Sequence, residues 1–178
     1  MLYLIRHGQT ELNRRKCWNC QADEELTEEG IRQAEAAADE IAKLPLDLII
    51  CSPLKRTRHT CAIVNRNQVP VILDERLMER EGGTLTGQPY EVYDHTRYYN
   101  YYAEDLPEGV EPLPDFMKRV HSLLDEIREK YADKNVLLVT HGGVSRCVKY
   151  YFEPIPADGQ IDRDSKTRNC EIKSFRMD

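Results

Sequence analysis

The sequence lacks the features that mark several large classes of protein. No apolar run approaches the ~20 residues that a membrane-spanning helix needs, so we expect no membrane association. The first residues contain neither a basic segment nor a small-residue cleavage site, and we therefore expect a cytoplasmic protein. Acidic residues also outnumber basic ones: the chain has 25 Lys and Arg and 31 Asp and Glu, which gives a net charge of −6. A general nucleic-acid-binding protein would show a basic patch or stripe, so we expect no nucleic-acid partner.

The six cysteines do not form a pattern typical of a metal or redox site. Cys17 and Cys20 make a C-x-x-C pair. A redox pair normally opens a helix of a thioredoxin-like unit, and a structural zinc site would need two more nearby ligands. Because neither context is present, we favour a structural role for the pair. The other four lie in apolar or strand-like stretches and are expected to be buried as small hydrophobic residues: Cys51, Cys61, Cys147 and Cys170.

The length of 178 residues predicts one domain, 1–178, and the pattern of elements predicts the α/β class. Apolar runs predict strands at 2–6, 48–51, 69–73, 136–140 and 169–175. Apolar residues at helical spacing predict helices at 27–44, 52–65, 116–127 and 143–151. Thr27 is the expected N-cap of the first helix, and Ser52, followed by Pro53, that of the second. Strands that alternate with helices indicate a mainly parallel sheet, and roughly residues 88–114 form a short insertion over the functional site.

Two His-Gly pairs each follow an apolar strand directly. The first is Arg6-His7-Gly8, and the second is His141-Gly142 after Thr140. A single Arg-His-Gly would ordinarily be a strand end followed by a polar turn, but its repetition favours a site. Ligands of open α/β sheets bind at the carboxyl ends of the strands. Right-handed crossovers place the ends of the first, second and fourth strands along one edge, so Arg56 is expected to lie close to both histidines.

This set of side chains is suited to a phosphate ester. Arg offers planar pairs of donors that match phosphate oxygens, so Arg6 and Arg56 are candidates to neutralise a phosphoryl group. An imidazole nitrogen of His7 can attack phosphorus, and His141 would donate to the charge that develops on the oxygens. The leaving alkoxide needs a proton from a carboxyl group, for which Glu79 and Glu81 are candidates. No carboxylate cluster suggests a metal, and the chemistry requires none.

Five ordered motifs carry a resemblance to a known family. Residues 6–13 match R-H-G-x-T-x-x-N, and residues 140–143 match a second histidine motif, T-H-G-G. Three further segments lie between them, namely 23–34 (D-x-x-L-T-x-x-G-x-x-Q-A), 52–60 (S-P-L-x-R-x-x-x-T) and 77–87, which holds the acid. Together they resemble the histidine phosphatase superfamily, which has the phosphoglycerate-mutase-like fold. The resemblance spans residues 1 to about 175 and implies a three-layer α/β/α sandwich.

The resemblance also implies roles for individual residues. His7 would be the nucleophile and Glu79 the proton donor, a choice that spacing alone does not make between Glu79 and Glu81. Arg6, Arg56 and His141 would form the phosphate pocket. Further substrate-binding residues are expected at Asn13, Thr10, Arg80 and Gly142. No cofactor is expected.

The function expected is that of a metal-independent phosphomonoesterase, acting on a small phosphorylated metabolite as a monomer or homodimer. One alternative is a cofactor-dependent mutase of the phosphoglycerate type, and another is a non-catalytic protein that binds phosphorylated ligands. The insertion is shorter than in true mutases, and mutases often have H-G-N where this chain has His141-Gly142-Gly143. Both departures favour hydrolysis.

Other histidines and tyrosines have less specific interpretations. His59, His95 and His121 are expected to be surface or helix residues that bind no ligand. Five tyrosines lie between Tyr93 and Tyr102, and they either cover core surface or line a substrate cavity. The sequence does not choose between these two roles.

Overall fold

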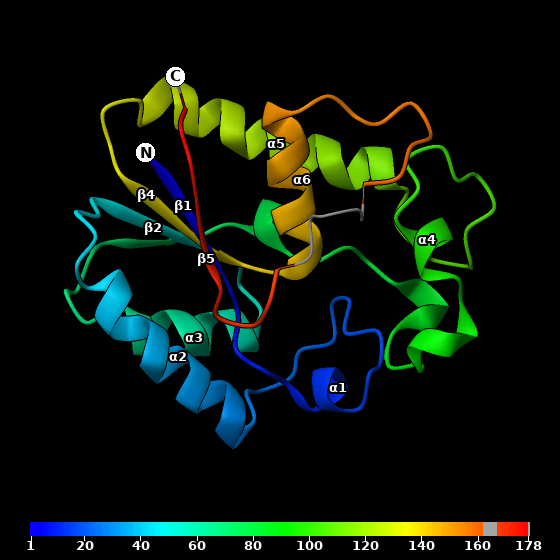
Figure 1. Ribbon diagram of the computed structural model, residues 1–178, viewed down its shortest axis with the longest axis horizontal. Coiled ribbons are helices and arrows are strands. Elements are labelled where there is room, and N and C mark those ends of the chain that lie inside the picture. The colour runs from blue at the N-terminus through cyan, green and yellow to red at the C-terminus, as the bar shows by residue number, and fades with distance from the viewer. Residues whose placement is uncertain (162–166, 178) are drawn as a thin grey trace.

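A computed structural model describes residues 1–161 and 167–177 of the chain (Figure 1). Five strands form one sheet in the order β3-β2-β4-β1-β5. They are β1 (Leu2–Arg6), β2 (Leu48–Cys51), β3 (Val71–Leu73), β4 (Val136–Thr140) and β5 (Ile172–Phe175). Only β5, at one edge, runs antiparallel to its neighbour. The register pairs Arg6 with Thr140, so the residues that follow them, His7 and His141, emerge side by side.

Helices cover both faces of the sheet, which confirms the α/β/α sandwich. Figure 1 shows α2 (Glu28–Ile41) and α3 (Lys55–Val64) on one face, and α5 (Leu113–Lys130) and α6 (Gly142–Phe152) on the other. Strand side chains alternate between the two layers: Ile5 packs with the α2–α3 layer, whereas Leu4 packs with the α5–α6 layer. Of the helices in the described ranges, none combines the length and the apolar character that a bilayer crossing requires.

The start of α3 differs from the prediction. Ser52 was expected to cap this helix, but the helix begins at Lys55, and the preceding Leu54 is extended. The N–H of Lys55 donates instead to Oδ1 of Asp23, at 2.7 Å. The hydroxyl of Ser52 is buried against His141, 89 residues away in the chain, at 2.8 Å from Nε2. The Ser52 hydroxyl, which the local sequence predicted to cap the helix, is therefore bonded to a distant residue, His141.

Other boundaries lie close to the predicted ones. Thr27 caps α2, accepting a hydrogen bond from the N–H of Gly30 at 3.1 Å, as expected. The last strand begins three residues later than predicted, because Cys170 has a φ of +56° that no strand residue adopts. The segment predicted as an insertion contains a 3₁₀ turn, Tyr90–Val92, and the short helix α4 (His95–Tyr98). Three more short elements complete the described chain: α1 (Glu11–Arg14) and the 3₁₀ turns Glu75–Leu77 and Gly83–Leu85.

Candidate active site

A cavity of about 430 Å³ lies where β1 and β4 end. Two different walls enclose it. The polar wall comes from strand ends and the loops and helix that follow them: Arg6, His7, Asn13, Asn19, Glu79, Gly142, Gly143 and Arg146. The aromatic wall comes from the first loop and the insertion: Trp18, Tyr90, His95, Tyr98 and Tyr99, with Cys20 beside them.

His7 is held as a neutral imidazole in one tautomer. Its Nδ1 lies 2.7 Å from the carbonyl oxygen of Gly8, which can only accept, so Nδ1 carries the proton. Nε2 therefore keeps its lone pair. Burial, followed by the charges of Arg56 and Arg6, lowers the pKa of His7 well below its usual value. A neutral ring with one committed nitrogen and one free lone pair is the form that a nucleophilic histidine needs.

His141 packs against His7, with the two ring centroids 5.2 Å apart. Its Nδ1 accepts from Nε of Arg56 at 3.3 Å, so Nε2 carries the proton and donates to Oγ of Ser52. Burial and the charge of Arg56 lower the pKa of His141 well below its usual value. The ring is fully buried and does not line the cavity. His141 thus lies beside the predicted nucleophile, but a phosphate contact from it stays a prediction.

The Arg56 guanidinium lies behind the histidines and does not line the cavity wall. Besides His141, it donates to the carbonyl oxygens of Cys20, at 2.6 Å, and Ala22. Burial lowers the pKa of Arg56 to about 10, so it remains charged at neutral pH. The structure therefore places a fixed positive charge next to both rings, and a direct phosphate contact from Arg56 stays a prediction.

A different arginine shares the polar wall with Arg6. A side chain added at Gly142 would meet Nη1 of Arg146 at 3.5 Å and Cζ of Arg6 at 3.5 Å, so the two guanidinium groups converge at the start of α6. Arg146 donates to the carbonyl oxygen of Gly142 at 2.9 Å and stacks over Tyr99. Sequence reasoning missed Arg146. The sequence feature that could have indicated Arg146 is its position four residues after Gly142, which puts both residues on one face of the helix.

Glu79 enters the cavity, and Glu81 does not. The Glu79 carboxylate accepts from the N–H of Gly143 at 2.9 Å and from that of Arg80 at 2.9 Å. A Cβ atom at position 143 would lie only 2.1 Å from Oε1 of Glu79, so the carboxylate occupies the space that a side chain there would fill. Glu81 instead accepts from the N–H groups of Gly82 and Gly83 within its own loop. The position of Glu79 agrees with the choice that the resemblance made.

The remaining predicted substrate-binding residues divide into two groups. Asn13 and Gly142 line the cavity. Thr10 is fully buried and caps α1, where it accepts from the N–H of Asn13 at 3.3 Å. The Arg80 guanidinium is also buried, and it donates to the carbonyl oxygens of Glu111, at 2.6 Å, and Tyr98. Both side chains bond to groups within the protein, and a substrate contact from Thr10 or Arg80 stays a prediction.

Comparison with known proteins decides the family. The sequence model of the histidine phosphatase superfamily (branch 1) matches residues 2–178. The chain belongs to this superfamily.

Relatives of this chain carry both phosphatase and mutase names. A "probable phosphoglycerate mutase GpmB" of Yersinia pestis is 31% identical over 179 residues, which covers 96% of this chain and 82% of the relative. The structure of a mycobacterial glucosyl-3-phosphoglycerate phosphatase in complex with VO3 is similar, with a TM-score of 0.84 and 27% identity, covering 96% of this chain and 90% of the other. An α-ribazole phosphatase of Shigella flexneri has a TM-score of 0.76 and 28% identity, covering 88% and 81%.

The sequence patterns did not predict most of the aromatic wall. Trp18 is its centre, with its ring 4.4 Å from that of Tyr98 and 5.4 Å from that of His95, on which it stacks. His95 is a helix residue, as expected, and α4 also places it on the cavity wall. Tyr98 and Tyr99 are buried and line the cavity, whereas Tyr93 and Tyr101 are half-buried against the hydrophobic core, so the tyrosine cluster has both of the roles considered.

All six cysteines are free thiols, and all except the half-buried Cys170 are buried. Cys20 lies on the cavity wall, its Sγ 3.8 Å from the hydroxyl of Tyr98, and burial raises its pKa to about 11. Cys17 points its Sγ toward the carbonyl oxygen of Arg15. Within residues 1–161 and 167–177, no group of three or more His, Cys, Asp or Glu is placed to hold a metal ion.

Proposed function

We propose that this histidine phosphatase is a metal-independent phosphomonoesterase, which hydrolyses a small phosphorylated metabolite through a phosphohistidine. The observation that carries the proposal is the state of His7. Its ring is neutral, Nδ1 is bonded to Gly8, and the Nε2 lone pair belongs to a residue on the cavity wall. A cavity of about 430 Å³ suits a small molecule.

The first step would transfer the phosphoryl group to the enzyme. Nε2 of His7 forms a bond to phosphorus as the bond from phosphorus to the ester oxygen breaks. The leaving oxygen takes a proton from the carboxyl group of Glu79. Arg6, Arg146 and the amino-terminal end of α6 supply positive potential on the cavity wall, and Arg56 supplies it from behind the rings.

The second step would release phosphate. A water molecule attacks phosphorus, the bond from phosphorus to Nε2 breaks, and the Glu79 carboxylate accepts the proton of the water. This returns Glu79 to its protonated form and His7 to the neutral imidazole, so the cycle closes without a metal or cofactor.

The second candidate is a mutase, which the name of the Yersinia relative favours. Gly143 argues for hydrolysis. The Asn that mutases often carry after His-Gly would displace the Glu79 carboxylate from this position, since its Cβ would lie 2.1 Å from Oε1. Two solved relatives are named as phosphatases of other phosphorylated compounds, which supports the same choice.

The experiment is a panel of phosphorylated metabolites, assayed for phosphate release at neutral and mildly acidic pH. 3-Phosphoglycerate is included and assayed for isomerisation as well. We expect phosphate release from at least one metabolite to exceed isomerisation. Dominant isomerisation would make the protein a mutase. Retained ligand binding without turnover of any ester would make it a non-catalytic binding protein.

A further inference from the structure

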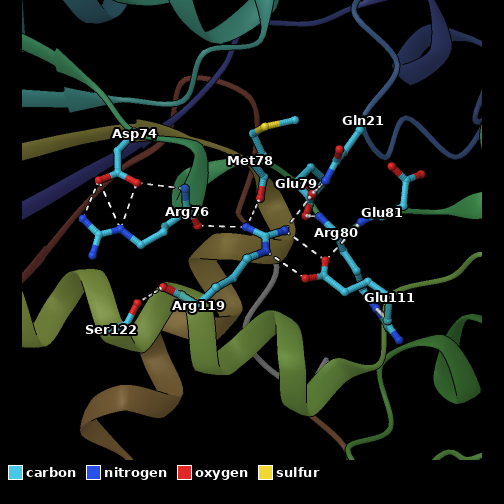
Figure 2. A network of polar contacts seen from close by, with 10 residues as sticks. All are labelled: Gln21, Asp74, Arg76, Met78, Glu79, Arg80, Glu81, Glu111, Arg119 and Ser122. Atoms are coloured by element: carbon cyan, nitrogen blue, oxygen red, sulfur yellow. Dashed lines mark hydrogen bonds and ion pairs between the residues drawn. The ribbon is translucent and has the colours of Figure 1, made fainter.

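Arg119, which no step above uses, is bonded to the segment that carries Glu79. It lies on α5 and does not line the cavity. Its Nη1 donates to the carbonyl oxygens of Arg76 and Met78, each at 2.8 Å, and its Nη2 to that of Glu79 at 3.0 Å (Figure 2). One side chain therefore binds three carbonyl groups within four residues.

The guanidinium is fixed from the other side by Glu111. Nε of Arg119 donates to Oε1 of Glu111 at 2.8 Å, and Nη2 donates to Oε2 at 3.0 Å. A guanidinium has five N–H groups in a rigid plane, and these five contacts use all of them. Glu111 also accepts from the N–H of Glu81 at 3.2 Å, so both ends of the 76–81 segment are tied to one ion pair.

Two other contacts also hold the segment: the hydroxyl of Thr140 donates to the carbonyl oxygen of Leu77 at 3.0 Å, and the N–H of Glu111 donates to that of Glu81 at 3.0 Å. The 3₁₀ turn ends at Leu77, and residues 78–81 belong to no helix or strand. Backbone carbonyls without a ladder or a helix need other donors, and Arg119 supplies them. The side chain of Gln21 adds one more, donating to the Glu79 carbonyl oxygen at 3.0 Å. Figure 2 shows Arg119 reaching the Glu79 backbone from the side of α5 and Gln21 reaching it from a different direction.

We propose that Arg119 is a positioning residue for the proton donor. By fixing the carbonyl groups on both sides of the Glu79 Cα atom, it holds the carboxyl group against the N–H of Gly143, on the cavity wall. The proposal rests on the proposed function, in which Glu79 protonates the leaving group. It assigns Arg119 an effect on that proton transfer alone, since His7 and its hydrogen bonds involve none of the same residues.

A leaving-group comparison tests this. The rate of His7 phosphorylation is measured in the first turnover, with an alkyl phosphate and with p-nitrophenyl phosphate, whose anion leaves without a proton. Arg119→Ala should slow the alkyl ester at least about tenfold more than the nitrophenyl ester, because general acid catalysis is worth about 10²- to 10⁴-fold. Arg119→Lys should recover part of this loss, since an ammonium offers fewer and differently placed donors. If Arg119→Ala does not fold, Arg119→Lys carries the same comparison.

Arg128→Ala is the matched control. It removes an arginine from the same helix, where it donates to the carbonyl of Met177 and lies over the ring of Tyr151, and it should leave both rates unchanged because it does not line the cavity. Equal losses with the two esters in Arg119→Ala would mean that Arg119 merely stabilises the fold, and would overturn the proposal.

A double-mutant cycle separates the positioning role of Arg119 from the proton-donor role proposed for Glu79. In a Glu79→Gln background, Arg119→Ala should cost the alkyl ester little more, because the proton donor that it positions is already gone. Full additivity of the two losses would overturn the role of Arg119 while leaving that of Glu79 standing. A Glu79→Gln variant with no leaving-group contrast, in an enzyme that does turn over, would overturn the proton-donor assignment and the role of Arg119 together.

Discussion

The two walls of the cavity are built in different ways. Residues of the polar wall follow strand ends or begin α6, so the sheet register alone brings His7 beside His141. The aromatic wall comes from loops and the four-residue helix α4, held by contacts such as the stacking of Trp18 on His95. The two histidines thus follow rigid strands, whereas Glu79 and the residues that would meet the rest of the substrate lie on short or irregular segments. Chemistry and substrate choice should therefore respond to different mutations.

Removing one histidine from each wall is the most severe test of the different roles assigned to the two walls. His7→Ala should lower kcat by about 10⁴-fold or more, because it removes the nitrogen on which the proposed covalent intermediate forms. His95→Ala should leave kcat within a few fold of the wild-type value and should mainly raise KM. Steady-state kinetics on both variants decide the matter, and a loss of kcat in His95→Ala similar to that in His7→Ala would contradict the division of labour.

Gly143→Ala tests the polar wall without replacing a charged residue. The added Cβ would lie 2.1 Å from Oε1 of Glu79 and must displace the carboxyl group. We expect about a hundredfold loss with an alkyl phosphate and a much smaller loss with p-nitrophenyl phosphate. Unchanged kinetics with both esters would show that the position of Glu79 does not matter.

The buried histidine pair should also make stability depend on pH. The pKa values of His7 and His141 are both lowered in the folded state, chiefly by burial, whereas the unfolded chain binds protons near pH 6.5. As pH falls below about 6.5, the unfolded state takes up protons that the folded state does not. The free energy of unfolding should then fall by about 1.4 kcal/mol per pH unit for each histidine, until the folded pKa is reached.

Urea denaturation between pH 5 and pH 8 measures this dependence, and His141→Asn should reduce the slope by about one proton. A free energy of unfolding that stays constant over this range would show that the two rings are not held neutral.

The smallest expected effect belongs to Trp18. Trp18→Ala removes the centre of the aromatic wall and should raise KM several fold for a bulky metabolite, in line with about 0.5–1.5 kcal/mol for a ring contact. A methyl ester, too small to reach that wall, should be unaffected. Trp18→Phe is the control, because Nε1 of Trp18 has no hydrogen-bond partner among the described residues and the change breaks none. Equal changes for both esters would deny the aromatic wall a role in substrate choice.

The difference between the walls also explains what the sequence could predict. His7 and His141 are readable because each directly follows an apolar strand, and parallel strands end together. His95 was predicted only as a surface or helix residue, because its place on the cavity wall depends on how the insertion folds back on Trp18, which no local pattern records. Ser52 was wrongly predicted as an N-cap for a similar reason, since its partner lies 89 residues away. Local rules assign a polar group its nearest partner, and these side chains took distant ones.

The central claim is that His7 accepts the phosphoryl group on Nε2, and trapping that intermediate tests it most directly. The enzyme is mixed with a ³²P-labelled ester that it hydrolyses, quenched within one turnover in alkali, and digested for peptide mapping. Label should appear on His7 in an acid-labile, alkali-stable bond, and it should be absent from His7→Ala. Label on a serine or cysteine, or turnover with no labelled enzyme at any time point, would contradict the account.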